Sequence, residues 1–256
     1  MLGSRPSNKL QMADAAYRLA AIDRDFVLGD STRGIRFQLE YQKAEEALRA
    51  MNIESTVVVF GSARVHEGDP LGWYEGAREF GRICSQKGGA KDHSSRPLQN
   101  VIATGGGPGI MEAANRGAYD ADAPSIGYNI TLPMEQGPNP FSTPDLTFRF
   151  HYFAMRKMHF AMRASALVVF PGGFGTFDEL FELLTLRQTG KMTKPLPVVL
   201  YDSKFWNTVV NFKHLADTKL INAKDLELFT MADTPQSTWD ELVKRGLKVP
   251  LEGQSK

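Results

Sequence analysis

The stretch Pro171-Gly-Gly-Phe-Gly-Thr-Phe-Asp-Glu179 decides the fold of this chain. It follows the short apolar run Ala166-Leu-Val-Val-Phe170 and leads into Asp178-Glu-Leu-Phe-Glu-Leu-Leu184, which has helical spacing. This order predicts a strand, a glycine turn and a helix whose first backbone N–H groups lack partners, which suits a phosphate or another anion. We expect Glu179 in the first turn of that helix. A carboxylate beside an anion site indicates chemistry on the group that carries the phosphate.

A second glycine turn lies upstream, in Val101-Ile-Ala-Thr-Gly-Gly-Gly-Pro-Gly-Ile-Met111. A helix follows it, and Pro108 suits a first-turn position. Two such turns from one sheet are expected at the carboxyl ends of its strands, where open α/β sheets bind ligands. The alternative is that both are tight connections and nothing more. Two turns together, one of them carrying Thr176 and Glu179, favour a ligand site.

Apolar runs of strand length alternate with segments of helical periodicity along most of the chain. Strands are expected at residues 56–60, 101–104, 125–130, 146–150, 166–170 and 196–200. Helices are expected at 34–51, 71–87, 152–163, 204–220 and 238–247, besides one that follows the Gly105 turn and runs to about residue 119 and one after Pro171. This alternation predicts a Rossmann-like α/β fold, an open parallel sheet with helices on both faces. We expect one such nucleotide-binding domain over residues 51–250, after an N-terminal helical extension over residues 1–50. Residues 91–99 read as a surface insertion, and the proline-rich loop at 132–145 is a candidate lid or pocket wall.

Composition excludes several classes of protein. The 256 residues are 42% hydrophobic and 23% charged with a net charge of +1, so no global field favours nucleic acid or an acidic membrane surface. No apolar run approaches the ~20 residues of a membrane helix. Cys84 is the single cysteine, which leaves no disulfide framework and no cysteine-based zinc site. The cytoplasm is the expected location.

Familiar cofactor motifs are missing from the sequence. The first strand ends in Gly61-Ser-Ala-Arg64, which is not the dinucleotide fingerprint, and no P-loop sequence occurs. The five histidines form no recognisable metal-ligand pair with cysteine or acidic residues. We therefore expect no metal and no cofactor, and a site that works with carboxylate, arginine and backbone dipoles. These groups suit cleavage of an N-glycosidic bond, because the ribose then develops oxocarbenium character that a carboxylate stabilises.

Three motifs, Gly105-Gly-Gly-Pro-Gly-Ile-Met111, Met155-Arg-Lys157 and Pro171-Gly-Gly-Phe-Gly-Thr-Phe-Asp-Glu179, resemble the signatures of the LOG ("Lonely Guy") family. The resemblance covers roughly residues 56–220. It implies a phosphoribohydrolase that acts on cytokinin riboside 5′-monophosphates or on AMP, and a homodimer or higher homo-oligomer. Members are often labelled "possible lysine decarboxylase", but we find no Schiff-base lysine in the setting that a pyridoxal enzyme needs.

The resemblance also implies roles for individual residues. Glu179 matches the catalytic glutamate and Arg156 the catalytic arginine, while Asp178 stands where many members have a first glutamate. The substrate-binding positions that it implies are Gly106, Gly107, Gly109, Lys157, Gly173, Gly175 and Thr176. From the residues alone, Ser62 and Arg64 are candidates for the pocket wall, and Glu112 either reaches ribose hydroxyls or complements its helix dipole.

Two functions remain open on this evidence. The first is hydrolysis of a purine nucleoside 5′-monophosphate, with adenine or an N6-substituted adenine as the base, to free base and ribose 5-phosphate. The second is a non-catalytic carrier that binds a nucleotide or the molybdenum cofactor. Glycine turns alone would serve a carrier, whereas the pair Arg156 and Glu179 favours the enzyme.

Overall fold

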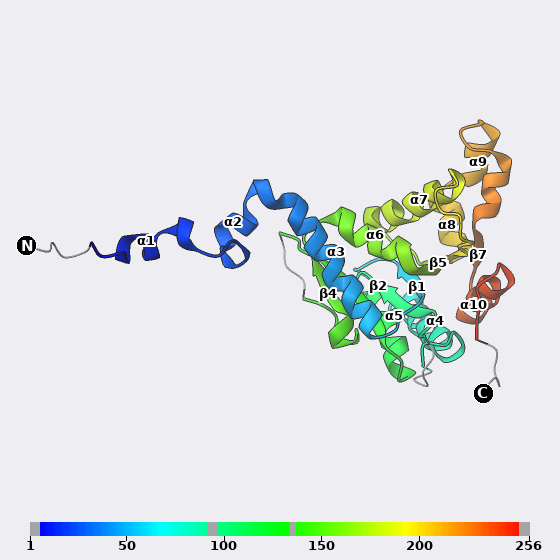
Figure 1. Ribbon diagram of the computed structural model, residues 1–256. Coiled ribbons are helices and arrows are strands. Elements are labelled where there is room, and N and C mark those ends of the chain that lie inside the picture. Colours follow the sequence, from blue (N-terminus) through cyan, green and yellow to red (C-terminus); the bar gives the residue numbers. More distant parts are fainter. Residues whose placement is uncertain (1–5, 92–96, 134–136, 251–256) are drawn as a thin grey trace, which may run out of the picture. The chain divides into compact units, whose positions relative to one another are not determined.

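The computed structural model describes residues 6–91, 97–133 and 137–250 (Figure 1). The middle of the expected insertion (residues 92–96) and part of the proline-rich loop (134–136) lie outside the described residues. The chain divides into two compact units, Met1–Lys43 and Ala44–Lys256. The boundary falls within the long helix α3 (Arg33–Ala50).

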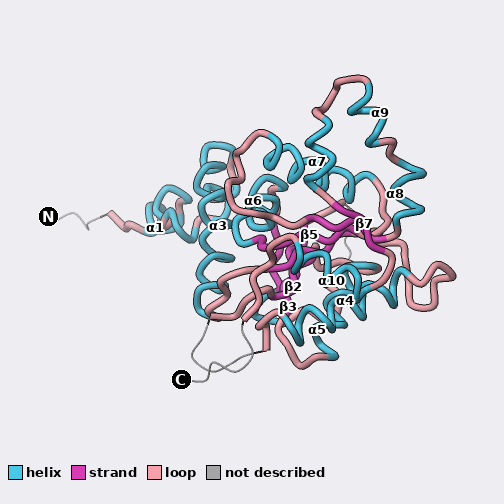
Figure 2. The backbone as a smooth tube through the Cα atoms, turned by 90° about the vertical axis from the view of Figure 1, so that its right-hand side faces the viewer, coloured by secondary structure: helices cyan, strands magenta, loops and turns pink. Residues whose placement is uncertain are grey.

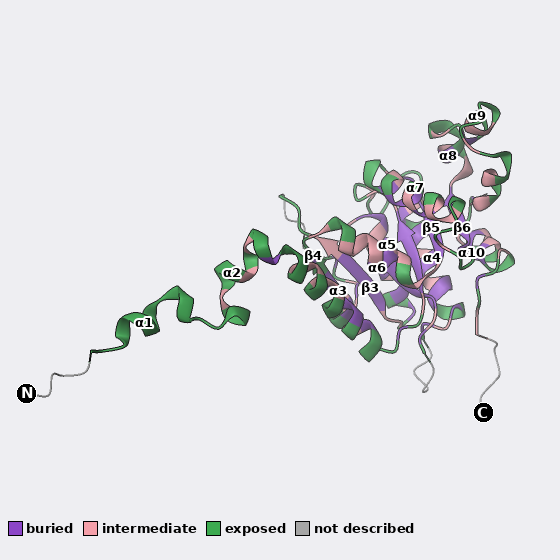
Figure 3. Cartoon of the chain, turned by 45° about the horizontal axis from the view of Figure 1, so that its top comes forward, coloured by how far each residue is buried: buried purple, intermediate pink, exposed green. Residues whose placement is uncertain are grey.

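The first unit consists of short helical pieces followed by the first part of α3. Helices α1 (Lys9–Ala13) and α2 (Arg24–Leu28) have five residues each, and 3₁₀ turns join them to α3. Most of its side chains are exposed, as the colouring in Figure 3 shows. The expected helix at 34–51 is confirmed as α3.

The second unit is built on a seven-stranded sheet in which every pair of neighbours is parallel, with the order β4-β3-β2-β1-β5-β6-β7. Its strands are β1 (Thr56–Phe60), β2 (Val101–Thr104), β3 (Ser125–Ile130), β4 (Thr147–Phe150), β5 (Ala164–Val169), β6 (Val198–Tyr201) and β7 (Thr230–Ala232). The parallel α/β fold is therefore confirmed. The sequence did not predict β7, whose three residues are too few to show a strand pattern.

Helices cover both faces of this sheet (Figure 2). Val58 and Phe60 of β1 face one core, which also holds side chains of α3, α6 (Phe153–Arg163) and α7 (Phe174–Gln188). Val57 and Val59 face the opposite core, with α4 (Trp73–Lys87), α5 (Ile110–Asp120) and α10 (Pro235–Lys244). A strand that is buried on both faces is apolar at every position, as β1 is.

The expected helix at 204–220 is wrong, because the structure has two helices there. Helix α8 (Ser203–Val209) ends before Asn211, and α9 (Phe212–Asp217) begins after it. The Asn211 side chain accepts a hydrogen bond of 2.9 Å from the His214 N–H, which caps the new helix. Within the described ranges, no helix has both the length and the apolar character that crossing a bilayer requires.

The strand order positions the functional site. The chain lays down β1 to β4 in one direction and then returns to place β5 on the other side of β1. The connections that leave the carboxyl ends of β1 and β5 therefore run to opposite faces of the sheet. A crevice at such a switch point is the usual ligand site of open α/β sheets.

Candidate active site

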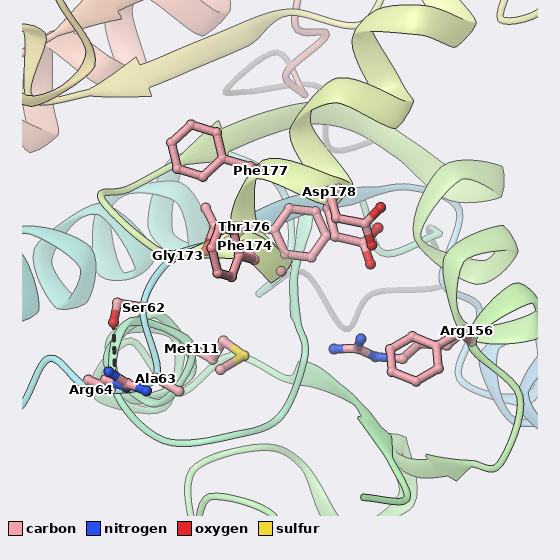
Figure 4. Close-up of a pocket in the computed structure, with 15 residues that line it drawn as sticks. Ser62, Ala63, Arg64, Met111, Arg156, Gly173, Phe174, Thr176, Phe177 and Asp178 are labelled. Carbon is pink, nitrogen blue, oxygen red and sulfur yellow. Dashed lines mark hydrogen bonds between the residues drawn. The ribbon is translucent and has the colours of Figure 1, made fainter. Parts of the chain in front are cut away.

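A cavity of about 930 Å³ lies at the switch point between β1 and β5 (Figure 4). Residues 60–64, at the end of β1, form one wall, and residues 173–179 of the second glycine turn and α7 form another. Met111 of α5 and the α6 residues Phe153 and Arg156 complete the lining. Of the expected site residues, the structure brings Ser62, Gly173, Gly175, Thr176, Glu179 and Arg156 together here, along with Arg64.

The backbone of Ser62 joins the two glycine motifs. Its N–H donates a hydrogen bond of 3.0 Å to the Pro171 carbonyl oxygen, and its own carbonyl accepts one of 3.0 Å from the Ile110 N–H. Gly109 has a positive φ of 74°, and a Cβ there would lie 2.3 Å from the Ser62 oxygen. The first glycine turn thus supports the β1 turn by close backbone contact.

Four expected substrate-binding residues, Gly106, Gly107, Gly109 and Glu112, do not line the cavity. The two glycine motifs are not neighbours in the sheet, because β1 lies between β2 and β5. The Glu112 carboxylate accepts a hydrogen bond of 2.8 Å from the Tyr74 hydroxyl. Gly109 therefore supports the cavity wall through Ser62, whereas the Glu112 carboxylate is engaged with Tyr74 of α4.

The described part of the proline-rich loop is anchored on the first glycine turn. The Asn139 N–H donates to the Gly106 carbonyl at 2.8 Å, and its Nδ2 donates to the Gly107 carbonyl at 3.1 Å. Asn139 and Ser142 are buried. None of the described loop residues, 132–133 and 137–145, lines the cavity.

Helix α7 begins earlier than the sequence predicted. It starts at Phe174, with Gly173 as its N-cap, so the glycine motif forms its first turn. The expectation that Glu179 lies in the first turn is wrong, since that turn contains no acidic residue. Any stabilisation by the helix dipole falls off within the first turn, so dipole complementarity does not explain this carboxylate. The N-terminal end of α7 faces the cavity through residues 173–176. The positive end of the helix dipole lies there, which suits an anion.

Glu179 is a buried carboxyl group, only 6% exposed, in the wall of the cavity. Burial raises the pKa of Glu179 to about 7, although the positive charges of Lys157 and Arg156 oppose that rise. A carboxyl group with such a pKa exchanges protons near neutral pH, as general acid–base chemistry requires.

Arg156 is held so that its guanidinium reaches the cavity. Its Nε donates to the Tyr128 carbonyl oxygen at 2.7 Å, and its Cζ lies 5.2 Å from the centre of the Phe160 ring. Figure 4 shows the side chain entering the cavity from the side opposite Ser62 and Arg64. Burial lowers the pKa of Arg156, and the nearby Glu179 and Asp178 oppose that effect. An arginine keeps its charge under such conditions and can hold an anion with its remaining N–H groups.

Lys157 points elsewhere, although it follows Arg156 in sequence. Its ammonium lies 2.8 Å from both the Asp178 and the Glu182 carboxylates and 3.9 Å from that of Glu179. It does not line the cavity. Successive residues of a helix point about 100° apart, which separates the two cations of the Arg-Lys motif.

Two aromatic residues at the cavity were not singled out from the sequence. Phe174 is 97% exposed and Phe153 is 51% exposed, and both line the cavity. An exposed aromatic ring beside a cavity offers a flat apolar surface for a ligand. Their positions in the sequence could have indicated a place at the cavity: Phe174 interrupts the glycine motif, and Phe153 stands three residues before Arg156.

Replacing Gly105 by alanine is expected to lower any catalytic turnover in this cavity by ~10-fold or more, because a displacement of the Arg156 guanidinium would misplace a group that lines it. A Cβ at Gly105 would lie 2.4 Å from an Arg156 terminal nitrogen and 2.8 Å from the Met111 sulfur, so the guanidinium must move. Steady-state kinetics of Gly105→Ala would measure the loss. The control is Gly34→Ala on α3, where no atom lies within 4 Å and activity should be unchanged. Equal activity of the two variants would show that the position of Arg156 does not matter.

Comparison with known proteins identifies the family of this chain. The family model described as "Possible lysine decarboxylase" matches residues 111–242, just over half of the chain, including α6 and α7. A "probable cytokinin riboside 5'-monophosphate phosphoribohydrolase" of Oryza sativa subsp. japonica is 26% identical over 136 residues, which are 52% of this chain and 58% of that protein. The chain thus spans a little over half of that relative's length.

A second relative and one solved structure extend the comparison. A cytokinin riboside 5'-monophosphate phosphoribohydrolase of Arabidopsis thaliana is 26% identical over 184 residues, covering 65% of this chain and 82% of that protein. The X-ray structure of the protein TM1055 has a TM-score of 0.52 at 20% identity over 74% of this chain and 99% of its own, a likeness of fold. Together with the family model, these matches show that the chain belongs to the family described as possible lysine decarboxylases, which includes the LOG-type proteins.

Proposed function

We propose that this protein hydrolyses the N-glycosidic bond of a purine nucleoside 5′-monophosphate, AMP or an N6-substituted derivative, to free base and ribose 5-phosphate. The observation that carries the proposal is the buried Glu179 carboxyl, with a pKa of about 7, in one cavity with Arg156 and the start of α7. The names of the plant relatives, which are phosphoribohydrolases of a nucleoside 5′-monophosphate, support the same reaction.

The start of α7 suits the 5′-phosphate. Residues 173–176 present the N-terminal end of a fifteen-residue helix to the cavity, and Thr176 adds a hydroxyl there. Arg64 and Arg156 line the same cavity and supply positive charge from two sides. Binding energy from the phosphate would position C1′ of the ribose for attack.

Glu179 would act on the reacting carbon. As the C1′–N bond breaks, the base leaves with the bonding electrons and the ribose develops positive charge, which an adjacent carboxylate stabilises. The carboxylate also accepts a proton from the attacking water, whose oxygen bonds to C1′. That proton then passes from Glu179 to a nitrogen of the departing base, so that the base leaves as a neutral molecule and the carboxylate is regenerated. The ionised form is the active one, so we expect turnover to fall as the pH drops below about 7, the pKa of Glu179.

The aromatic residues would contact the base. Phe153 and Phe174 line the cavity, the first half exposed and the second almost fully exposed. A purine that stacks on such a ring gains ~1–3 kcal/mol. An aromatic surface accepts adenine and an N6-substituted adenine alike, so the assay must compare both.

Chromatographic separation of products from AMP, GMP, CMP and N6-isopentenyl-AMP tests the proposal. Purine nucleotides should release free base, and adenosine, which lacks the phosphate, should react at least ~10²-fold more slowly because the positioning energy is lost. Equal rates with AMP and adenosine would contradict the phosphate site. If no nucleotide releases base while a nucleotide or a pterin stabilises the protein against heat, the carrier function would replace the enzyme.

A further inference from the structure

The ammonium of Lys157 is shared among three carboxylates of α7. Asp178 and Glu182 are four residues apart, so they lie on one face of the helix, and each approaches the Lys157 nitrogen to 2.8 Å. Glu179 lies about a quarter-turn away and is 3.9 Å from the same nitrogen. Two like charges at this spacing repel each other, and a cation between them removes that cost.

The four side chains differ in their access to water. Lys157 is 18% exposed, whereas Glu182 and Asp178 are 39% and 57% exposed and Glu179 is buried. The cation therefore pairs with the two carboxylates on the outer side of α7. Lys157 and Glu182 also line a second, shallower depression, of about 580 Å³, and neither lines the cavity of Glu179.

We propose that Glu182 is a positioning residue for the reaction proposed above: together with Asp178 it holds the Lys157 ammonium on the outer side of α7 and keeps that cation from forming a full ion pair with Glu179. The consequence is that Glu179 stays a good proton acceptor near neutral pH. This inference rests on the proposed function.

The charged groups around Glu179 in the described chain come from both helices, and their effects on its pKa agree with a Lys157 ammonium held away from it. Lys157 and Arg156 of α6 lower its pKa, and Glu182 and Asp178 of α7 raise it. Arg64 lines the same cavity from the β1 turn. If Glu182 lost its charge, its repulsion would vanish and Lys157 would be freer to approach Glu179. If Lys157 lost its charge, the main opposing cation would be gone.

The two substitutions therefore have opposite signs. In Glu182→Gln the pKa of Glu179 should fall, so the acid limb of the pH–rate profile moves to lower pH and the ratio of activity at pH 6 to that at pH 8 rises roughly three-fold or more. In Lys157→Gln the pKa should rise, and that ratio should fall by a similar factor. Asp178 is not used as the test, because it lines the cavity and can touch the substrate.

The matched control is the pair Lys244 and Glu241, which also lie 2.8 Å apart but on α10. Glu241→Gln and Lys244→Gln should leave the pH–rate profile unchanged. Loss of turnover in Glu182→Gln by one factor at every pH would overturn the inference, because a structural role predicts that result. A raised KM in Lys157→Gln without any change of the pH profile would overturn it too, in favour of direct contact between Lys157 and the substrate phosphate.

A second readout does not require turnover. Carbon-13 NMR of the glutamate carboxyl groups, with the Glu179 signal assigned from Glu179→Gln, follows the titration of Glu179 directly in the wild type and both variants. If the wild type proves inactive, the proposed function fails, yet the opposite displacements of this titration would still support the role of Glu182. Identical titrations in all three proteins would overturn it.

Discussion

Glu179→Gln is expected to lower turnover by ~10²–10⁴-fold, the range for a positioned acid or base, while KM changes little. The substitution keeps the shape of the side chain but removes its charge and its ability to accept a proton. Steady-state kinetics with AMP at pH 8 measures the effect. Glu75→Gln is the control, because Glu75 lies in the first turn of α4 and is a mostly exposed surface acid. Similar activity in both variants would remove Glu179 from the mechanism.

The same variant should be more stable than the wild type at pH 8. The pKa of Glu179 is about 7 in the folded protein, against 4.5 as its ordinary value. Because folding raises this pKa, the contribution of the carboxyl group to stability is full below pH 4.5 and is lost as the pH rises through 7. Glutamine avoids that loss, so we expect the free energy of unfolding of the variant to exceed that of the wild type by ~1–3 kcal/mol at pH 8, a difference that disappears near pH 4.5. Denaturant unfolding at both pH values measures it, and a less stable variant at pH 8 would contradict the burial argument.

Arg156→Lys is expected to lower kcat/KM for AMP by ~10²-fold, although the charge is kept, because lysine lacks the fixed planar fork of arginine. The Arg156 Nε is committed to the Tyr128 carbonyl, and this bond orients the other N–H groups towards the cavity. A lysine ammonium cannot make both contacts. Steady-state kinetics of Arg156→Lys with AMP at pH 8 measures the fall in kcat/KM.

The control for Arg156→Lys is Arg82→Lys on α4. Arg82 pairs with Glu79 at the surface and does not line the cavity. The control should retain full activity. A change in kcat/KM of less than about three-fold in Arg156→Lys would show that charge alone is needed and that the fork geometry of the guanidinium is not used.

Much of the fold is predictable because the strands are short apolar runs between glycine turns and amphipathic helices. The run at 56–60 and the alternation after it suffice for a parallel sheet. The sequence pattern predicts too late a start for α7, because glycine and phenylalanine at 172–175 are typical of a turn and Gly173 has no side chain to signal a cap. The sequence does not indicate the break at Asn211, because asparagine also occurs within helices.

The composition of the candidate site was harder to predict. Local patterns do not say which strands are neighbours, so the sequence could not show that the Ser62 turn, rather than the first glycine turn, faces the second motif. The sequence also does not distinguish two adjacent cationic residues that have different surroundings in the structure. Arg156 and Lys157 form one motif, yet helical rotation sends the first to the cavity and the second to the acidic face of α7.

The most direct test of the central claim is the stoichiometry of product release from AMP at pH 8 by the wild type and by Glu179→Gln. We predict that the wild type releases adenine and ribose 5-phosphate in equal amounts, and that Glu179→Gln binds AMP but releases almost none of either product. Release of neither product by the wild type, or equal release by both proteins, would contradict the account.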